Sequence, residues 1–202
     1  MTRKEQPADQ PEWGPMLTLP NLFTFLRALL VPVILVLLFQ RDDVSRWWAF
    51  GIFSFAAWTD SVDGWVARRW SGVTRWGQLA DPIADKLLIG GSLVSLALVG
   101  DLPWVAVIII IVREVGVTGL RLTLIQRHRF VMPASPWGKL KTISQIAAVG
   151  AYLVPPFPAA LASVLLWAAV ALTIWSGVEY ALQAARLART ADSAPVDPTA
   201  RS

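Results

Sequence analysis

The 202-residue sequence contains no cysteine and a single histidine, His128. Without cysteine the chain has no disulfide, thiol nucleophile, iron–sulfur cluster or thiolate zinc site, and one histidine excludes a metal site built from several imidazoles. Charged residues are scarce, at 16% of the chain, where about 25% is usual. Apolar residues make up 55%, which is more than a soluble domain of this length needs. The composition therefore indicates an integral membrane protein.

Six apolar segments, separated by polar or proline-containing breaks, predict six helices. They are Leu22–Phe39, Trp47–Val66, Ile83–Val99, Trp104–Leu124, Ile143–Val154 and Leu161–Leu182. A membrane-spanning helix needs about 20 residues, so we expect polar flanks to lengthen the third and fifth segments. The predicted fold class is an all-α integral membrane protein, a bundle of six transmembrane helices. Its predicted parts are an N-terminal segment (1–20), a membrane domain (21–188) and a disordered tail (189–202).

The distribution of basic residues predicts how this bundle is oriented. With six spans both termini lie on one side, and the loops on the other side are 40–46, 100–103 and 155–160. These loops contain Arg41 and Arg46 and none of the other Lys and Arg, of which the chain has 18 in all. The positive-inside rule then places both termini in the cytoplasm. We expect a multi-pass protein of the cytoplasmic (inner) cell membrane, whose net charge of +4 faces the lipid bilayer surface and not a nucleic acid.

Four aspartates flank the loop between the second and third segments, in the cytoplasmic half of the bundle. Asp60 and Asp63 are three residues apart, and Asp81 and Asp85 are four apart, so each pair shares one helix face. Two carboxylates 4 Å apart repel by about 4 kcal/mol at an effective dielectric constant of 20. A hard divalent cation, Mg²⁺, Mn²⁺ or Ca²⁺, would offset this repulsion in an all-oxygen site. Two such ions could clamp a diphosphate and an attacking oxygen.

The stretch that carries these aspartates reads DSVDGWVARRWSGVTRWGQLADPIAD over residues 60–85. It resembles the signature D-x2-D-G-x2-A-R-x8-G-x3-D-x3-D of the CDP-alcohol phosphatidyltransferase family. All specified positions are present at the right spacing: Asp60, Asp63, Gly64, Ala67, Arg68, Gly77, Asp81 and Asp85. The six-segment layout extends the resemblance over most of the chain.

The resemblance implies a six-helix membrane bundle that forms a homodimer. It implies a reaction in which a hydroxyl attacks the β-phosphate of CDP-diacylglycerol and CMP leaves. Asp60, Asp63 and Asp81 would be metal ligands, while Asp85 would lie at the metal site and act as the catalytic base. The implied cofactor is Mg²⁺ or Mn²⁺, as two ions. The CDP-lipid pocket would be formed by Asp60, Asp63, Gly64, Ala67, Arg68 and Gly77.

Further local patterns resemble the branch of the family whose acceptor is sn-glycerol 3-phosphate. They are Pro20–Leu22 with Thr24 and Arg27, Asp81–Lys86, Arg113–Glu114, Arg121, and Gly138–Thr142 with Gln145. An acceptor phosphate needs cations of its own, apart from the metals, and the candidates are Arg113, Arg121, Lys139 and Lys141. Asn21, Thr24 and Arg27 are candidate supporting residues. The alternative for the two lysines is snorkelling to the membrane interface. Arg113 and Glu114 are helix neighbours that point to different sides, so each could pair elsewhere; Glu114 and Glu179 receive no role.

Three functions stay open on the sequence. The first is transfer of the phosphatidyl group to glycerol 3-phosphate, and the second is the same chemistry with phosphatidylglycerol, inositol phosphate or serine as acceptor. Cations for a phosphorylated head group disfavour serine. The third is an ion transporter with intramembrane carboxylates, which usually has a repeated architecture and acids near the midplane. Here the acids lie toward one side, and no repeat is evident.

Overall fold

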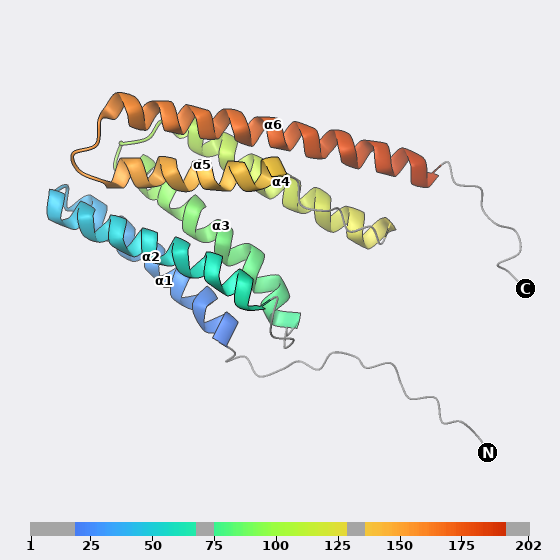
Figure 1. The fold of residues 1–202 in the computed structure, drawn as a ribbon, viewed down its shortest axis with the longest axis horizontal. Coiled ribbons are helices and arrows are strands. Elements are labelled where there is room, and N and C mark those ends of the chain that lie inside the picture. The colour runs from blue at the N-terminus through green and yellow to red at the C-terminus, as the bar shows by residue number, and fades with distance from the viewer. Residues whose placement is uncertain (1–18, 68–74, 129–135, 193–202) are drawn as a thin grey trace, which may run out of the picture. The chain divides into compact units, whose positions relative to one another are not determined.

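The structure of the chain, a computed structural model, describes residues 19–67, 75–128 and 136–192. Within these ranges the side chains that lie outside the description are those of residues 19–25, 27, 60–67, 75–85, 122, 124–128, 136 and 188–192. The described chain forms the helices α1 (Leu19–Phe39), α2 (Asp43–Ala67), α3 (Arg75–Leu98), α4 (Trp104–His128), α5 (Pro136–Leu153) and α6 (Ala159–Asp192) (Figure 1).

Each predicted segment coincides with one of these helices, so an all-α fold with six helices is confirmed for the described residues. The third and fifth segments are lengthened at their N-terminal ends by polar residues, and α3 and α5 begin at Arg75 and Pro136. Proline suits the first position of a helix, where no intrahelical N–H bond is needed. At the other end of the chain, α6 continues to Asp192. The alanine, leucine and arginine residues there are strong helix formers.

The short turns between the helices are capped by local hydrogen bonds. The Ser45 backbone N–H donates to Oδ1 of Asp42 at 2.9 Å, which makes Asp42 the N-cap of α2. Hydrogen bonds from the Ser45 backbone and then from its hydroxyl lower the pKa of Asp42. The pKa of Asp42 is lower in the folded chain than in the unfolded chain, so the charged cap contributes its full stabilisation at neutral pH. This contribution is lost as the pH falls through the lowered pKa. Gly100, with φ of 85°, takes the left-handed conformation that ends α3.

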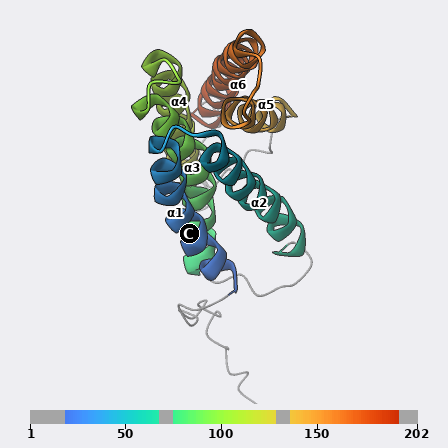
Figure 2. The same ribbon diagram turned by 90° about the vertical axis from the view of Figure 1, so that its left-hand side faces the viewer.

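The chain divides into two compact units, residues 1–95 and 96–202. In the first unit α1 and α2 form an antiparallel hairpin, and α3 runs beside α1 in the same direction (Figures 1 and 2). The buried apolar side chains of this unit include Ile34, Leu38, Phe53, Leu88 and Leu93. In the second unit α6 contacts both α4 and α5. Its buried apolar side chains include Val107, Ile110, Val149, Leu166 and Val170.

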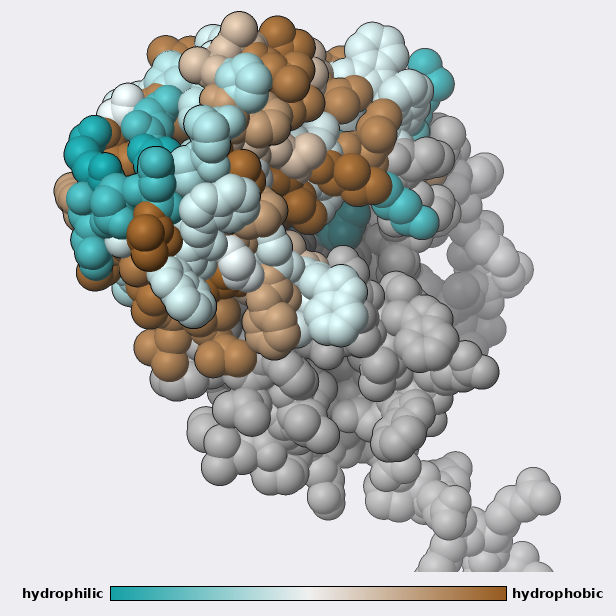
Figure 3. All heavy atoms as spheres, turned by 60° about the vertical axis from the view of Figure 1, so that its left-hand side comes forward, coloured by the Kyte–Doolittle hydropathy of each residue, from teal (hydrophilic) through white to brown (hydrophobic). Residues whose placement is uncertain are grey.

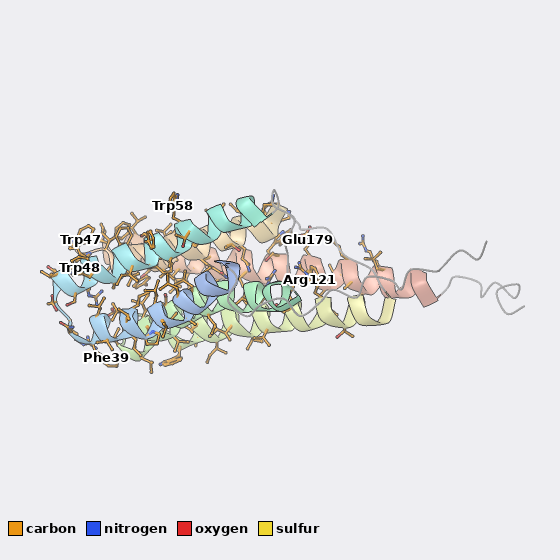
Figure 4. The ribbon with its side chains drawn as sticks, turned by 90° about the horizontal axis from the view of Figure 1, so that it is seen from below. Phe39, Trp47, Trp48, Trp58, Arg121 and Glu179 are labelled. Carbon is orange, nitrogen blue, oxygen red and sulfur yellow. The ribbon has the colours of Figure 1, made fainter. Side chains whose placement is uncertain are left out.

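Large apolar side chains also cover much of the outside of the helices. Trp47, Trp48 and Trp58 of α2 are 50%, 65% and 64% exposed, and Phe39 at the end of α1 is 58% exposed. Figure 4 shows these four side chains projecting from the two helices, and hydrophobic residues are spread over the described face in Figure 3. Exposed apolar surface of this extent marks a membrane or a protein partner.

One helical stretch of the described residues is long and apolar enough to cross a membrane, Ala159–Leu187 in α6 with 29 residues. Two shorter apolar stretches, Ala28–Phe39 and Lys86–Leu98, lie in α1 and α3. A single stretch of this kind also occurs in the core of soluble proteins. The predicted six spans and their orientation therefore stay predictions at this point.

Helices α1 and α3 approach each other closely at Gly91. A Cβ atom added to Gly91 would lie 2.4 Å from Cγ1 of Val31 and 3.1 Å from its Cγ2. Val31 is β-branched and stiff about χ1, so it has little freedom to move aside. The neighbouring Gly90 differs, because an added Cβ there meets nothing within 4 Å.

We predict that Gly91→Ala destabilises the folded chain by about 1–3 kcal/mol through overpacking. The measurement is the thermal unfolding midpoint of the purified protein in detergent. Gly90→Ala is the matched control and should leave the midpoint unchanged or raise it, because alanine is the better helix former. Adding Val31→Ala to Gly91→Ala should recover most of the loss. Equal midpoints for the Gly90 and Gly91 variants would contradict the close contact.

Candidate active site

The four motif aspartates lie on two helices of the first unit. Asp60 and Asp63 belong to the last turns of α2, and Asp81 and Asp85 belong to the first turns of α3. The side chains of all four lie outside the description, so their placement rests on the backbone. The spacing along each helix places both members of a pair on one face, as predicted.

The backbone brings the two aspartate-bearing stretches to the same end of the first unit. The end of α2 and the start of α3 lie there together with the start of α1 (Figures 1 and 2). The contact of Gly91 with Val31 sets the register of α3 against α1. Since both helices rise about 1.5 Å per residue, ten residues back along each helix Asp81 and Asn21 lie at the same level. The candidate supporting positions on α1 therefore share the end of the unit that carries the aspartates.

The remaining positions of the motif follow the same two helices. Gly64 and Ala67 lie in the last turns of α2, and Gly77 lies in the first turn of α3. Arg68 falls in residues 68–74, outside the described chain. Thr24 and Arg27 lie in the first turns of α1, and their side chains are not described.

The donors available for a metal site are carboxylates. Among the side chains that the structure describes, no group of three or more His, Asp or Glu could hold a metal ion. The four motif aspartates are not among those side chains. Two pairs of carboxylates at one end of one unit supply only oxygen donors, which hard divalent cations prefer. The donor set fits the predicted cations, and the assignment of individual ligands stays a prediction.

The second unit contains a buried group of polar side chains, which we call the polar cluster. It comprises Arg113, Glu114, Lys141, Gln145, Thr173 and Ser176. Nη1 of Arg113 donates to Oε1 of Glu114 at 3.2 Å, and Nζ of Lys141 donates to the same oxygen. Nη2 of Arg113 donates to Oγ of Ser176 at 2.9 Å. One carboxylate oxygen thus joins cations from α4 and α5, and the guanidinium reaches on to α6.

Burial makes these contacts consequential. The side chains of Arg113 and Glu114 are 14% and 18% exposed, and that of Lys141 is 7% exposed. A charge left unpaired in such surroundings is strongly unfavourable. Arg113 and Glu114 do find partners on other helices, as expected of neighbours that point to different sides. They also pair with each other, because the long arginine side chain reaches back to the adjacent carboxylate.

The polar cluster continues between α5 and α6. Nε2 of Gln145 donates to Oγ1 of Thr173 at 2.9 Å, and Oγ of Ser176 donates to the Thr173 carbonyl at 3.2 Å. Gln145, Thr173 and Ser176 are all at most 3% exposed. Gln145 belongs to a local pattern that resembles the glycerol 3-phosphate branch, but none of the three residues was predicted as a site residue. Thr173 and Ser176 were detectable as a polar pair, three residues apart, in a largely apolar segment.

Gly177 gives the Arg113 side chain room to lie along α6. A Cβ added to Gly177 would meet Cγ of Arg113 at 3.0 Å and its Nε at 3.4 Å. Nε of Arg113 is buried and has no hydrogen-bond partner among the described residues. Buried N–H groups are nearly always paired, so this nitrogen is a candidate donor to an anionic ligand.

The other two predicted acceptor cations lie outside the polar cluster. Arg121 is eight residues further along α4, or about 12 Å by helix rise, and its Cζ lies 5.6 Å from the centre of the Tyr180 ring. In Figure 4 it lies toward the same end of the second unit as Glu179, whose Oε1 accepts a hydrogen bond from Gln183 at 3.2 Å. Lys139 is exposed and, two residues from Lys141, points to a different side of α5. The structure therefore joins Arg113 with Lys141 and leaves Arg121 and Lys139 apart from them.

Comparison with known proteins identifies the family. Residues 17–175 match the CDP-alcohol phosphatidyltransferase family. A protein of Mycobacterium tuberculosis (strain H37Rv) named "Probable phosphatidylglycerophosphate synthase" is 43% identical over 189 residues, which are 88% of this chain and 89% of that protein. A "CDP-diacylglycerol--glycerol-3-phosphate 3-phosphatidyltransferase" of Bacillus subtilis (strain 168) is 38% identical over 182 residues, with 82% and 94% covered. One of the same name from Haemophilus influenzae is 34% identical over 173 residues, with 83% and 93% covered.

The chain belongs to the CDP-alcohol phosphatidyltransferase family. The resemblance carried by residues 60–85 is thereby confirmed. The family consists of membrane-associated phosphotransferases that generally depend on a divalent metal.

We predict that Thr173→Val destabilises the second unit by about 1–3 kcal/mol, because it leaves Nε2 of the buried Gln145 without its acceptor. The measurement is again the thermal unfolding midpoint in detergent. Thr123→Val is the matched control, since its hydroxyl bonds to the Gly119 carbonyl at an exposed site of α4 and its loss should change little. An equal effect of both substitutions would show that the Gln145–Thr173 bond does not hold α5 to α6.

Proposed function

We propose that the protein transfers the phosphatidyl group of CDP-diacylglycerol to a hydroxyl of sn-glycerol 3-phosphate, giving phosphatidylglycerophosphate and CMP. The observation that carries this proposal is the similarity, over most of both chains, to relatives named for this reaction at 34–43% identity. The complete aspartate motif on α2 and α3 agrees with it. The protein would then act in phospholipid biosynthesis.

In this proposal the motif residues carry the group transfer. Asp60, Asp63 and Asp81 would hold two Mg²⁺ or Mn²⁺ ions, and the chemistry these ions would supply is neutralisation of charge on the diphosphate. Asp85 accepts the proton of the acceptor hydroxyl. The hydroxyl oxygen forms a new bond to the β-phosphorus as the bond from that phosphorus to the bridging oxygen breaks, and CMP leaves with the bridging oxygen.

The other motif positions shape the CDP-lipid pocket. Gly64, Ala67 and Gly77 carry little or no side chain, so a diphosphate can approach the backbone of α2 and α3 closely. Arg68 follows Gly64 by one turn and can bind a phosphate through two N–H donors.

The acceptor phosphate binds to Arg113 and Lys141 in this proposal. Together with Glu114 these residues carry one net positive charge in largely buried surroundings. The N–H at Nε of Arg113 is available to donate a hydrogen bond to the phosphate. Arg121 and Lys139, which the structure leaves apart from these two residues, stay candidates on the sequence alone, and Asn21, Thr24 and Arg27 support the aspartates. A cationic site of this kind suits a phosphorylated acceptor and disfavours serine.

The membrane setting is also part of the proposal. The six helices cross the cytoplasmic membrane, both termini lie in the cytoplasm, and the active site opens to that side. The exposed apolar side chains of the helices support this arrangement, because lipid-facing side chains need no polar partner. Two copies form a homodimer, as the family resemblance implies.

The first test is a radiolabel transfer assay with the purified protein in detergent. CDP-diacylglycerol and Mg²⁺ or Mn²⁺ are supplied, and glycerol 3-phosphate, inositol phosphate, phosphatidylglycerol and serine are offered separately. We expect metal-dependent CMP release with glycerol 3-phosphate alone and loss of release with a chelator. Release with another acceptor would overturn the acceptor but keep the family chemistry. No release with any acceptor would overturn the proposed function.

The role of Asp85 is tested by Asp85→Asn, which keeps the shape of the side chain and removes its basicity. We predict a fall in turnover of about 10²–10⁴-fold, the usual contribution of a general base, with CDP-lipid binding and thermal stability largely kept. Asp42→Asn is the matched control, because asparagine caps a helix as well as aspartate does. Activity of Asp85→Asn equal to the wild type would refute the assignment.

A further inference from the structure

Glu114 occupies an unusual position in the polar cluster. One of its two carboxylate oxygens, Oε1, accepts hydrogen bonds both from Arg113 on its own helix and from Lys141 on α5. These are the two predicted acceptor cations that the structure brings together. The carboxylate therefore stands between the groups that the proposed function assigns to the substrate phosphate.

A carboxylate at this place can act in two opposite ways. As a charge it competes with the substrate phosphate for the same cations, so removing it would raise the net charge of the three side chains from +1 to +2 and strengthen phosphate binding. As a structural partner it keeps two mutually repelling cations together. Without it, Arg113 and Lys141 would move apart, and a phosphate would meet them one at a time.

The surroundings of Arg113 favour the structural role. Its Nη2 is held by Ser176 of α6 at 2.9 Å, and its stem lies against Gly177, where even one added methyl group would crowd it at 3.0 Å. Its Nη1 is held by Glu114, and its Nε alone has no partner among the described residues. The guanidinium is thus fixed on two sides, with one nitrogen left without a partner in the described part of the chain. Such fixing by neighbouring groups is how binding sites keep their donors in place.

We propose that Glu114 is a positioning residue, which holds Arg113 and Lys141 together so that both bind the phosphate of one acceptor molecule. This inference rests on the proposed function, since it presumes an acceptor with a phosphate. Ser176 assists by fixing the far side of the guanidinium. Glu114 touches no reacting atom and acts through its two partners.

The test measures two Michaelis constants for the full-length protein in detergent. KM for glycerol 3-phosphate is measured at saturating CDP-diacylglycerol, and KM for CDP-diacylglycerol at saturating glycerol 3-phosphate. We expect Glu114→Gln, which removes the charge and keeps the shape, to raise the first constant about 10- to 100-fold, as loss of an outer-shell partner does. The second constant should stay within about twofold. Glu114→Asp, which keeps the charge on a shorter stem, should recover part of the loss.

Two variants guard this test. Asp42→Asn makes the same carboxylate-to-amide change at the N-cap of α2 and should alter neither constant. If Glu114→Gln does not fold, Ser176→Ala takes its place, because it removes the bond to Nη2 and keeps every charge. Ser176→Ala should raise KM for glycerol 3-phosphate about three- to tenfold, which is less than the effect expected of Glu114→Gln. It should leave KM for CDP-diacylglycerol unchanged.

The outcomes separate this inference from the proposed function. A wild-type protein that is inactive with glycerol 3-phosphate would overturn the proposed function before any variant is compared. With an active wild type, a lower or unchanged KM for glycerol 3-phosphate in Glu114→Gln would overturn the positioning role. A parallel rise of both constants with a lowered unfolding midpoint would also overturn it, because it would show a general effect on the fold.

Discussion

A charged side chain between apolar helices must be paired, because the free energy of removing it from water is otherwise prohibitive. This constraint organises the second unit. Arg113 is mostly buried on α4 and Lys141 is buried on α5, and one oxygen of Glu114 accepts hydrogen bonds from both. The guanidinium in turn ties α4 to Ser176 of α6. The side chains that hold the helices of this unit together thus also carry one net positive charge.

The same constraint applies with the opposite sign in the first unit. There the last turns of α2 and the first turns of α3 carry four carboxylates at one end of the unit. Apolar neighbours cannot offset the repulsion between these carboxylates, so cations are needed to balance their charge. Further along α3 from these aspartates, the contact of Gly91 with Val31 shows how closely α3 approaches α1. A small residue at position 91 is what lets the two helices come this close.

The sequence predicted the helices well because their signal is local. Apolar runs and proline breaks are readable within a few residues. The aspartate positions were equally accessible, since spacing along one helix determines which positions share a face. The partners of Arg113 were not, because its contact with Ser176 joins residues 63 apart in the chain. Only the packing of α4 on α6 brings them together, and only the packed structure shows that Nε of Arg113 is unpaired among the described residues.

These observations bear on how one family can share a reaction and yet use different acceptors. The proposed chemistry resides in residues 60–85, where the motif prescribes every carboxylate. The proposed acceptor contacts reside in α4, α5 and α6, where buried donors set what can bind. An acceptor without a phosphate would leave the positive charge of the polar cluster uncompensated and Nε of Arg113 unpaired. Sites built around a buried hydrogen-bonding group reject analogues that lack the matching group by about 10⁴–10⁵-fold. Specificity for a phosphorylated acceptor then follows from the second unit and requires no change in the aspartates that carry out the transfer.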